Sequence, residues 1–422
     1  MSYMFGHITT RNSGPSPRSP RGGERKPLWL LLPLLLLCLA ACSSSDEEQT
    51  TDSPDGEQDK IPTQLYIYVH TPQTAVPTRA YPDDDVAPIG NEAKVYSLQI
   101  WVFTHDTNKL IGYFSPTGTV DLNKPEGSIF QLTIDEEYAQ ATSHENVDVY
   151  VLANVSDANC HLTLDHSTTR AQLEAAVLTH GTQDPFGLTA PVTTVTEGVG
   201  LPMSGVLRNQ KVTGTAPVLR LDKSGQIAFV SLIRTVSKLR FAFANQTGCE
   251  PLVINSIKLN ATMIPEEQYL FMADNPPYDR KTCHIKGSED SDYNTATSEL
   301  LAAPINDVPV IAQPVIYAWG NDETLTPQEY ESMLDDAATA GNLTQRMYYL
   351  RESDKQLRGE IKYQIGNGEE QTATFQMVDD GGFSRNHIWT VYAYQAQARL
   401  HVVVVNFAPW NITEKNYEFY NW

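Results

Sequence analysis

Apolar residues along this chain recur in short runs that alternate with polar residues or are rich in β-branched and aromatic side chains. Such runs predict β-strands rather than helices. The expected strands cover residues 65–69, 94–103, 104–114 (a turn and a strand), 129–134, 147–154, 218–221, 236–243, 251–259, 361–365, 372–377, 387–394 and 400–407. Many short strands separated by turn signals predict a mainly β protein built from β-sandwiches.

Helices and loops are expected at a few places between these strands. The spacing of Leu173, Ala176 and Val177 predicts an amphipathic helix over 168–178, with Thr168 or Thr169 as N-cap. A second short helix is expected over 326–340, and loops are expected over 198–207 and 273–310. In the strand that includes Val236 and Phe243, the cations Arg234, Lys238 and Arg240 are expected to form a solvated face.

The first strand of the body has a distinctive setting. Pro62 and Pro72 bracket it, and its run of apolar residues suits burial on both faces. Arg79 and Ala80 follow, and then the acidic stretch YPDDDVAPIG, which predicts an exposed loop open to a trypsin-like cut. Such a cut frees residues 61–79, and the departing side chains Leu65, Ile67 and Val69 leave a groove that invites another strand.

The residues before this strand have the form of an export signal. Basic residues precede a leucine-rich run at 28–39, and Leu39-Ala40-Ala41-Cys42 has the form of a bacterial lipobox. Residues 1–41 are therefore expected to be a lipoprotein signal peptide, with Cys42 acylated after cleavage. Residues 42–60 are polar and acidic, and are expected to form a flexible tether.

Charge and cysteine content narrow the function further. The formal net charge of −21 argues against nucleic acid and anionic lipid as partners. More than 340 residues follow the tether, which suggests two domains, here 80–223 and 224–422, with the boundary at 222–225. Cys160, Cys249 and Cys283 are equally compatible with one disulfide and with three buried thiols, and no Cys-x-x-Cys spacing indicates zinc.

Several motifs occur together in an order that resembles the fimbrillin-like lipoproteins of type V pili. They are the lipobox at Cys42, Thr78-Arg79-Ala80, EAKVYSLQIWVF at 92–103, VDVYVLAN at 147–154, LPMSG at 201–205, IRTVSKLRFAF at 233–243 followed by INSIKL, and FSRNHIWTVYAY at 383–394. The resemblance covers most of the chain after Cys42.

The resemblance implies two transthyretin-like β-sandwich domains with short helices, and a precursor anchored to the outer membrane by the lipid on Cys42. It also implies that an Arg-specific protease cuts after Arg79, and that the released strand is replaced by a C-terminal strand of a neighbouring pilin subunit in a surface fimbria. The candidate donor lies within 400–422, but the apolar residues after Trp410 do not alternate cleanly. Either 400–407 takes part in exchange, or the subunit occupies a tip or another position without a standard donor.

Two other classes of function are open. An enzyme is disfavoured, because the sequence has no His-Glu-x-x-His, no Gly-x-Ser-x-Gly and no phosphate-binding glycine loop, and no cofactor is expected. The aspartates at 83–85 and 379–380 lack EF-hand spacing, so no metal site is expected. A surface glycan-binding lipoprotein requires an exposed platform drawn from Trp101, Trp319, Trp389 and Trp410, and an uncut anchor subunit is the remaining alternative.

Overall fold

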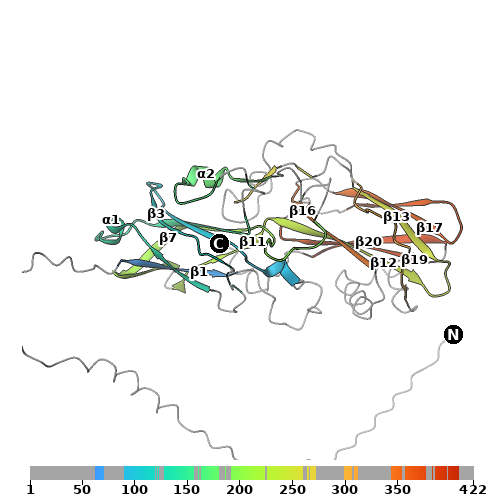
Figure 1. Cartoon of the computed structure of the whole chain (residues 1–422), viewed down its shortest axis with the longest axis horizontal. Coiled ribbons are helices and arrows are strands. Elements are labelled where there is room, and N and C mark those ends of the chain that lie inside the picture. The colour runs from blue at the N-terminus through green and yellow to red at the C-terminus, as the bar shows by residue number, and fades with distance from the viewer. Residues whose placement is uncertain are drawn as a thin grey trace, which may run out of the picture. The chain divides into compact units, whose positions relative to one another are not determined.

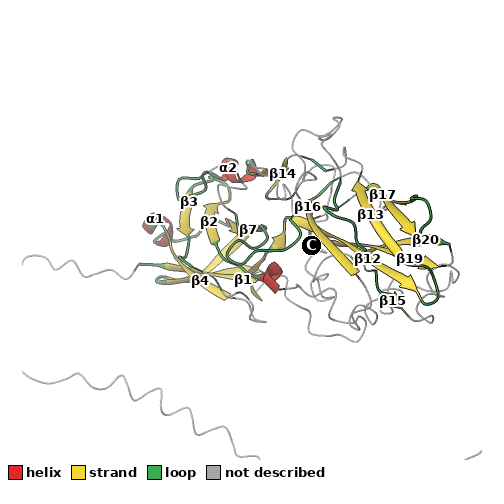
Figure 2. Ribbon diagram, turned by 45° about the vertical axis from the view of Figure 1, so that its right-hand side comes forward, coloured by secondary structure: helices red, strands yellow, loops and turns green. Residues whose placement is uncertain are grey.

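A computed structural model describes most of the chain after residue 61. The described residues are 62–70, 90–118, 120, 122, 128–155, 160, 163–179, 186, 192–223, 226–259, 264–265, 267–271, 299–306, 308–311, 344–353, 357–376, 383, 385–396 and 398–407. Strands predominate and the helices are short (Figure 2), which confirms the predicted mainly β class.

Ten strands from the first half of the chain form one sheet, here called the first sheet (Figure 1). They are β1 (Gln64–His70), β2 (Leu98–Thr104), β3 (Leu110–Phe114), β4 (Ser128–Thr133), β5 (Val147–Ala153), β7 (Met203–Thr215), β8 (Val218–Lys223), β9 (Gln226–Ile227), β10 (Phe229–Ser231) and β11 (Ile233–Arg234). Three helical segments accompany them: η1 (Gly90–Ala93), α1 (Glu136–Ala139) and α2 (Arg170–Glu174).

The long strand β7 connects two parts of the first sheet. Up to Gln210 it pairs with β5, and from Lys211 to Thr215 it pairs with β8. Near the end of the part paired with β5, where the register shifts, Asn209 has a φ of 54°, a left-handed conformation that asparagine tolerates better than most residues. This change of partner brings β8 to the position in which it pairs with β1.

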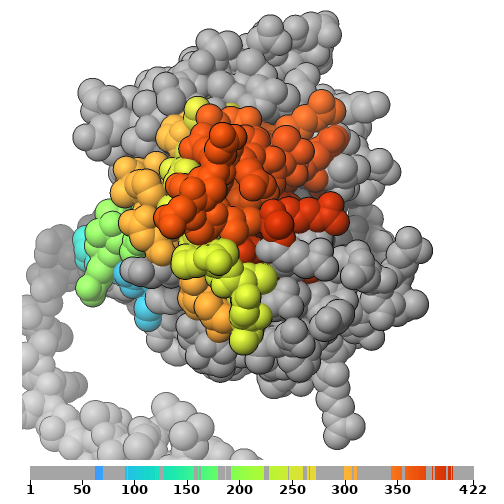
Figure 3. Space-filling model, turned by 90° about the vertical axis from the view of Figure 1, so that its right-hand side faces the viewer, coloured from blue at the N-terminus to red at the C-terminus, as the bar shows by residue number. Residues whose placement is uncertain are grey.

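The later strands form a second and a third sheet. The second contains β12 (Val236–Gln246), β15 (Val310–Ile311), β16 (Thr344–Arg351), β19 (Ile388–Ala396) and β20 (Arg399–Phe407). The third contains β13 (Leu252–Leu259), β17 (Arg358–Ile365) and β18 (Gln371–Gln376). A small pair, β6 (Val177–Thr179) with β14 (Glu267–Tyr269), joins residues from both halves of the chain. Figure 3 shows the late strands, in orange and red, beside yellow-green residues from nearer the middle of the chain.

The first and second sheets repeat one pairing arrangement. β1 lies between β4, to which it is antiparallel, and β8, to which it is parallel. β12 likewise lies between β16, to which it is antiparallel, and β19, to which it is parallel. β1 and β12 therefore hold equivalent internal positions, each as the first strand of its sheet.

Three clusters of buried side chains fill the space around these sheets. One underlies the first sheet and includes Leu65, Ile67 and Val69. Another lies among the strands of the second and third sheets and includes Trp389. The remaining cluster combines residues of both halves, among them Trp101 and Tyr349.

Several local expectations are corrected by the structure. The helix expected over 168–178 is only Arg170–Glu174, because Val177 joins β6 and pairs with Tyr269 of β14. Its N-cap is Thr169, which forms a capping box with Gln172. The loop expected over 198–207 gives way to strand β7 at Met203.

The expected boundary at 222–225 falls within the β8–β9 hairpin. β9, β10 and β11 follow that position and still pair within the first sheet, and the second sheet begins at Val236. The expected helix over 326–340 lies outside the described residues.

The expected solvated face of Arg234, Lys238 and Arg240 is wrong. All three side chains are buried, with exposed fractions of 0 to 2%. β12 is an internal strand with apolar clusters around it, so neither of its faces meets solvent. The alternation of charged and apolar residues in this stretch therefore corresponds to charged side chains that are buried, and not to a solvent-exposed face.

Candidate functional site

Strand β1 presents one buried and one half-buried face. Leu65, Ile67 and Val69 have no exposed surface, whereas Tyr66 and Tyr68 are half-buried. The expected burial on both faces is therefore met on the inner face only. This alternation is what a strand with one face toward the core produces.

Both edges of β1 are hydrogen-bonded to neighbouring strands. β4 pairs with it along Gln64–Val69, and on the opposite edge β8 pairs with Gln64–Tyr66 and β10 with Tyr68–His70. At the start of the strand, the backbone N–H of Gln64 donates to the backbone carbonyl of Pro217 at 2.9 Å. β1 is thus an internal strand, and its removal would leave unpaired backbone on both sides.

The inner side chains of β1 fit between apolar residues of these neighbours. Leu65 lies between Leu132 and Leu219, and Ile67 lies opposite Phe130. Burial of each such side chain stabilises the strand by about 1.5–3 kcal/mol before ordering costs. The space that β1 fills is therefore an apolar groove specific for alternate large side chains.

Polar side chains contribute little to holding β1. Among its described side chains, Gln64 makes a hydrogen bond, donating through Nε2 to Thr133 Oγ1 at 2.9 Å in an exposed position. The strand is therefore attached by its backbone ladder and by apolar burial, neither of which depends on a particular partner sequence.

The remaining predicted site residues, Cys42, Arg79 and Ala80, lie outside the described residues. The candidate donor segment is only partly described. Its residues 400–407 lie in β20, which pairs with β19 along its whole length within the same chain. Residues 408–422 lie outside the described part.

The arginines that the structure describes are all placed within ordered elements or buried. They lie in α2 or in strands, except Arg385, which is in a turn, is fully buried and bonds Glu352. A second Arg-Ala pair, Arg170-Ala171, begins α2 as the sequence predicted. A protease must bind an unpaired, extended segment, so these arginines are shielded from it.

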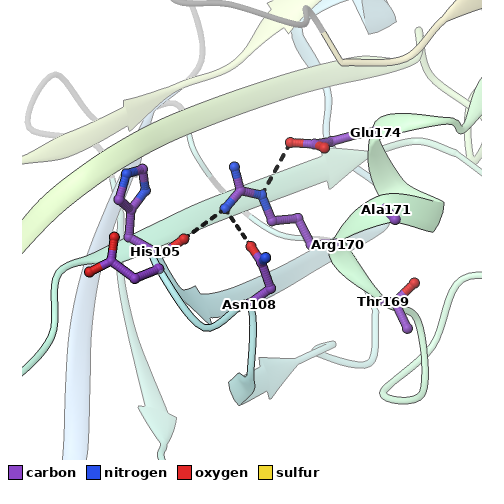
Figure 4. A pocket seen from close by; sticks show the side chains of 7 residues that line it. His105, Asn108, Thr169, Arg170, Ala171 and Glu174 are labelled. Atoms are coloured by element: carbon purple, nitrogen blue, oxygen red, sulfur yellow. Dashed lines mark hydrogen bonds and ion pairs between the residues drawn. The ribbon is translucent and has the colours of Figure 1, made fainter.

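Arg170 is held in a polar hollow of about 550 Å³ beside α2 (Figure 4). Its Nη1 lies 2.6 Å from Asp148 Oδ2 and donates to Asn108 Oδ1 at 2.7 Å, and its Nε donates to Glu174 at 3.2 Å. Asp148 is fully buried, and His105 Nδ1 lies 2.8 Å from its other oxygen. These contacts fix the Arg170-Ala171 bond within the fold.

Glu174 gathers three hydrogen bonds in the same hollow. Its Oε1 accepts from Tyr150 at 2.6 Å, from Arg208 at 2.7 Å and from Arg170. Burial alone would raise the pKa of Glu174, but these bonds outweigh burial and lower the pKa below its ordinary value. Burial and the Glu174 carboxylate together raise the pKa of the Tyr150 hydroxyl.

A buried polar cluster, which sequence reasoning missed, centres on Glu92 of η1. Its Oε1 lies 3.0 Å from Lys238 Nζ and accepts from the Tyr349 hydroxyl, and its carbonyl accepts from Arg234 Nε at 3.2 Å. All four residues are at most 2% exposed. Burial raises the pKa of Tyr349 and lowers that of Arg234 to about 10. The sequence feature that could have indicated this cluster is the presence of Lys238 and Arg240 within the otherwise apolar strand β12, with Arg234 just before it.

The candidate tryptophan platform is not formed by the residues that the structure describes. Trp101 and Trp389 are core residues with 0 and 1% exposure, and Trp101 Nε1 donates to Asp165 at 2.8 Å. Trp319 and Trp410 lie outside the described part. Cys160 is buried, Cys249 is half-buried, and Cys283 lies outside the described part.

Where the structure describes the chain, no three His, Cys, Asp or Glu side chains are grouped so as to hold a metal ion. Nor does any described helix have the length and apolar character needed to span a membrane.

Comparison with solved structures finds fimbrial proteins. The tip fimbrial protein Mfa3 from Porphyromonas gingivalis, with C-terminal truncation, is 12% identical with a TM-score of 0.46, over 82% of this chain and 99% of that chain. A fimbrial assembly protein from Parabacteroides distasonis is 13% identical with a TM-score of 0.36, over 82% and 95%. No protein-family model and no curated protein matches the sequence. Likeness of this degree assigns neither a family nor a function to this chain.

Proposed function

We propose that this chain is the precursor of a structural subunit of a cell-surface fimbria that serves adhesion. In this proposal it is exported as a lipoprotein anchored to the outer membrane through Cys42, and an Arg-specific protease cuts it after Arg79. Residues 42–79, which include β1, then leave, and a strand from a neighbouring pilin subunit takes the place of β1.

The observation that carries this proposal is the position of β1. It is the first strand of the described chain, yet it fills an internal place in the first sheet with ladder bonds on both edges. Because no other described strand or helix precedes β1, one cut between β1 and η1 can release it without severing another described element. The groove that remains offers two unpaired edges and apolar pockets to a new strand.

The placement of the described arginines disfavours a cut elsewhere in the described part of the chain. Described arginines such as Arg170 and Arg385 are locked by ion pairs or lie within strands. Cleavage at those positions would require local unfolding, which ordered elements resist.

The donor is proposed to come from residues 408–422 of a neighbouring subunit, since 400–407 are paired within their own sheet. The twelve residues after Trp410 can extend about 40 Å, which is ample for a strand as long as β1. The same segment supplies aromatic and aliphatic side chains, including Ile412, Tyr417 and Phe419.

The N-terminus and assembly state of the surface protein test this proposal. Wild-type chain recovered from cells is expected to begin at Ala80 and to form high-mass polymers. The Arg79→Ala variant is expected to begin at acylated Cys42 and to remain monomeric, with Arg170→Ala as the matched control that is still cut. Uncut monomeric wild-type chain would overturn the proposal in favour of an anchor subunit or another surface lipoprotein.

A further inference from the structure

The segment that follows the proposed cut site is attached to the fold by contacts of a different kind from those that hold β1. The first element described after residues 71–89 is η1, and the next described residues lead into β2. Side-chain hydrogen bonds fasten this stretch. Asn91 donates to Val195 O at 3.1 Å and accepts from the Tyr96 hydroxyl at 3.0 Å, while the Tyr96 amide donates to Asn154 Oδ1 at 2.7 Å.

Glu92 supplies the deepest of these attachments. Its carboxylate reaches Lys238 of β12 and Tyr349 of β16, and its carbonyl reaches Arg234 of β11. These partners belong to three strands of two sheets. A carboxylate that is 1% exposed and paired with a fully buried ammonium is hard to withdraw, because separation leaves charge away from water.

The stretch that Glu92 holds also contributes to the apolar cluster that contains the inner side chains of β1. Val95 belongs to the same buried cluster as Leu65, Ile67 and Val69, and so does Leu98, the first residue of β2. If residues 90–97 peeled away with β1, this cluster would lose Val95 as well. Retention of these residues therefore preserves more of the cluster for an incoming strand.

We propose that Glu92 is a positioning residue that keeps the new N-terminal stretch of the cut chain in place while β1 leaves. This inference rests on the proposed cut after Arg79. The two sides of the cut are attached by different chemistry: ladder bonds and apolar side chains hold β1, and a buried ionic contact holds η1. Cleavage thus separates the exchangeable strand β1 from the helical segment η1, which stays attached.

The test uses the full chain with a site-specific protease sequence placed between Arg79 and Ala80. Amide hydrogen exchange of residues 90–97 is measured before and after the cut. Wild type is expected to keep its protection in both states. In the double variant Glu92→Ala/Lys238→Met, which removes both charges and leaves no unpaired lysine, exchange is expected to rise at least tenfold after the cut only.

Two controls make the result decisive. Glu137→Gln removes a carboxylate from an exposed pair with Lys109, 2.8 Å away, and is expected to behave as wild type. The near-UV circular dichroism of each variant reports whether the body is folded. Protection that survives the cut in the double variant overturns the inference, and so does equal loss of protection before the cut, because that marks a merely structural role.

The same samples separate this inference from the proposed function. Size-exclusion chromatography after the cut shows whether the N-terminal fragment that ends at Arg79 and contains β1 stays bound. Suppose that the N-terminal fragment remains bound while exchange of residues 90–97 rises after the cut in the double variant only. That result would contradict the proposed release of β1 and would support the proposed role of Glu92.

Discussion

At the scale of single residues, burial takes two chemical forms in this molecule. Leu65, Ile67 and Val69 are buried among apolar neighbours, whereas Glu92 and Lys238 are buried against each other. Apolar contacts tolerate a new partner of similar shape, but a buried ion pair requires its own partner. In the proposed exchange, the side chains that leave the fold are thus apolar, and those proposed to stay are charged.

Ile67→Ala tests the contribution of the central side chain of β1. Ile67 has no exposed surface and lies opposite Phe130, so its truncation creates a cavity. The free energy of opening of β1, measured by amide hydrogen exchange on uncut protein, is expected to fall by about 2–5 kcal/mol. Gln64→Ala, which removes one exposed hydrogen bond, is expected to change it by about 0.5 kcal/mol or less. Equal effects of the two substitutions would contradict apolar retention of the strand.

Glu174 is expected to make the stability of the folded protein depend on pH in the acid range. Because its pKa in the folded protein lies below the ordinary 4.5, the ionised carboxylate stabilises the fold above pH 4.5, and this stabilisation is lost as the pH falls through the folded-state pKa. Glu174→Gln is therefore expected to lower the thermal midpoint at pH 7, and its gap from wild type is expected to narrow as the pH falls below 4.5. Glu369→Gln, at an exposed position, is expected to follow wild type throughout this range. A constant gap between Glu174→Gln and wild type would contradict the assignment.

At the scale of elements, local pattern predicted most strands but not their partners. Period-two alternation located β13 and β17, in which buried and partly exposed positions alternate, and apolar runs located β2 and β5, which are buried on both faces. These patterns missed the start of β7, where Gly and Pro in LPMSG suggested a loop. The pairing of β1 with β8 and β10 joins residues more than 150 positions apart, which local pattern does not encode.

The candidate site was predictable to a similar extent. The strand itself followed from the sequence, because an apolar run is bounded by prolines, but its burial followed only in part: two buried faces were expected, and only the face of Leu65, Ile67 and Val69 is fully buried. The role of Glu92 did not, because η1 has only four residues and its partners lie more than 140 positions away. Charged residues within β12 were misread for the same reason: their environment depends on strands distant in sequence.

Gly205→Ala tests the crossing of β7 and β10 beside β1. A Cβ atom at Gly205 would lie 2.5 Å from Ser231 O and 2.7 Å from Val230 Cγ1, so the strands would have to move apart. The substitution is expected to destabilise the uncut protein by about 1–3 kcal/mol in urea unfolding and to increase hydrogen exchange of β1. Gly112→Ala, whose Cβ would meet its nearest atom at 3.4 Å, is the matched control. An unchanged exchange rate in β1 would show that β10 does not hold the strand.

At the scale of the whole molecule, one chain is expected to carry both an acceptor groove and a donor. Deletion of residues 411–422 is expected to leave cleavage after Arg79 intact and to abolish polymers, because the groove then has no incoming strand. Size-exclusion chromatography and N-terminal sequencing of the cut protein measure both outcomes. Deletion of the 43–60 tether is the control, and is expected to leave cleavage and assembly of purified protein unchanged. Polymers formed by the truncated chain would place the donor elsewhere.

The equivalence of β1 and β12 has a consequence for the shape of any assembly. β12 is eleven residues long and lies in the middle of the chain, so a single cut near the N-terminus cannot release it. If β1 is exchanged as proposed, each subunit has a valence of one for incoming strands, although it contains the same pairing arrangement twice. A fibre assembled in this way would grow end to end without branches.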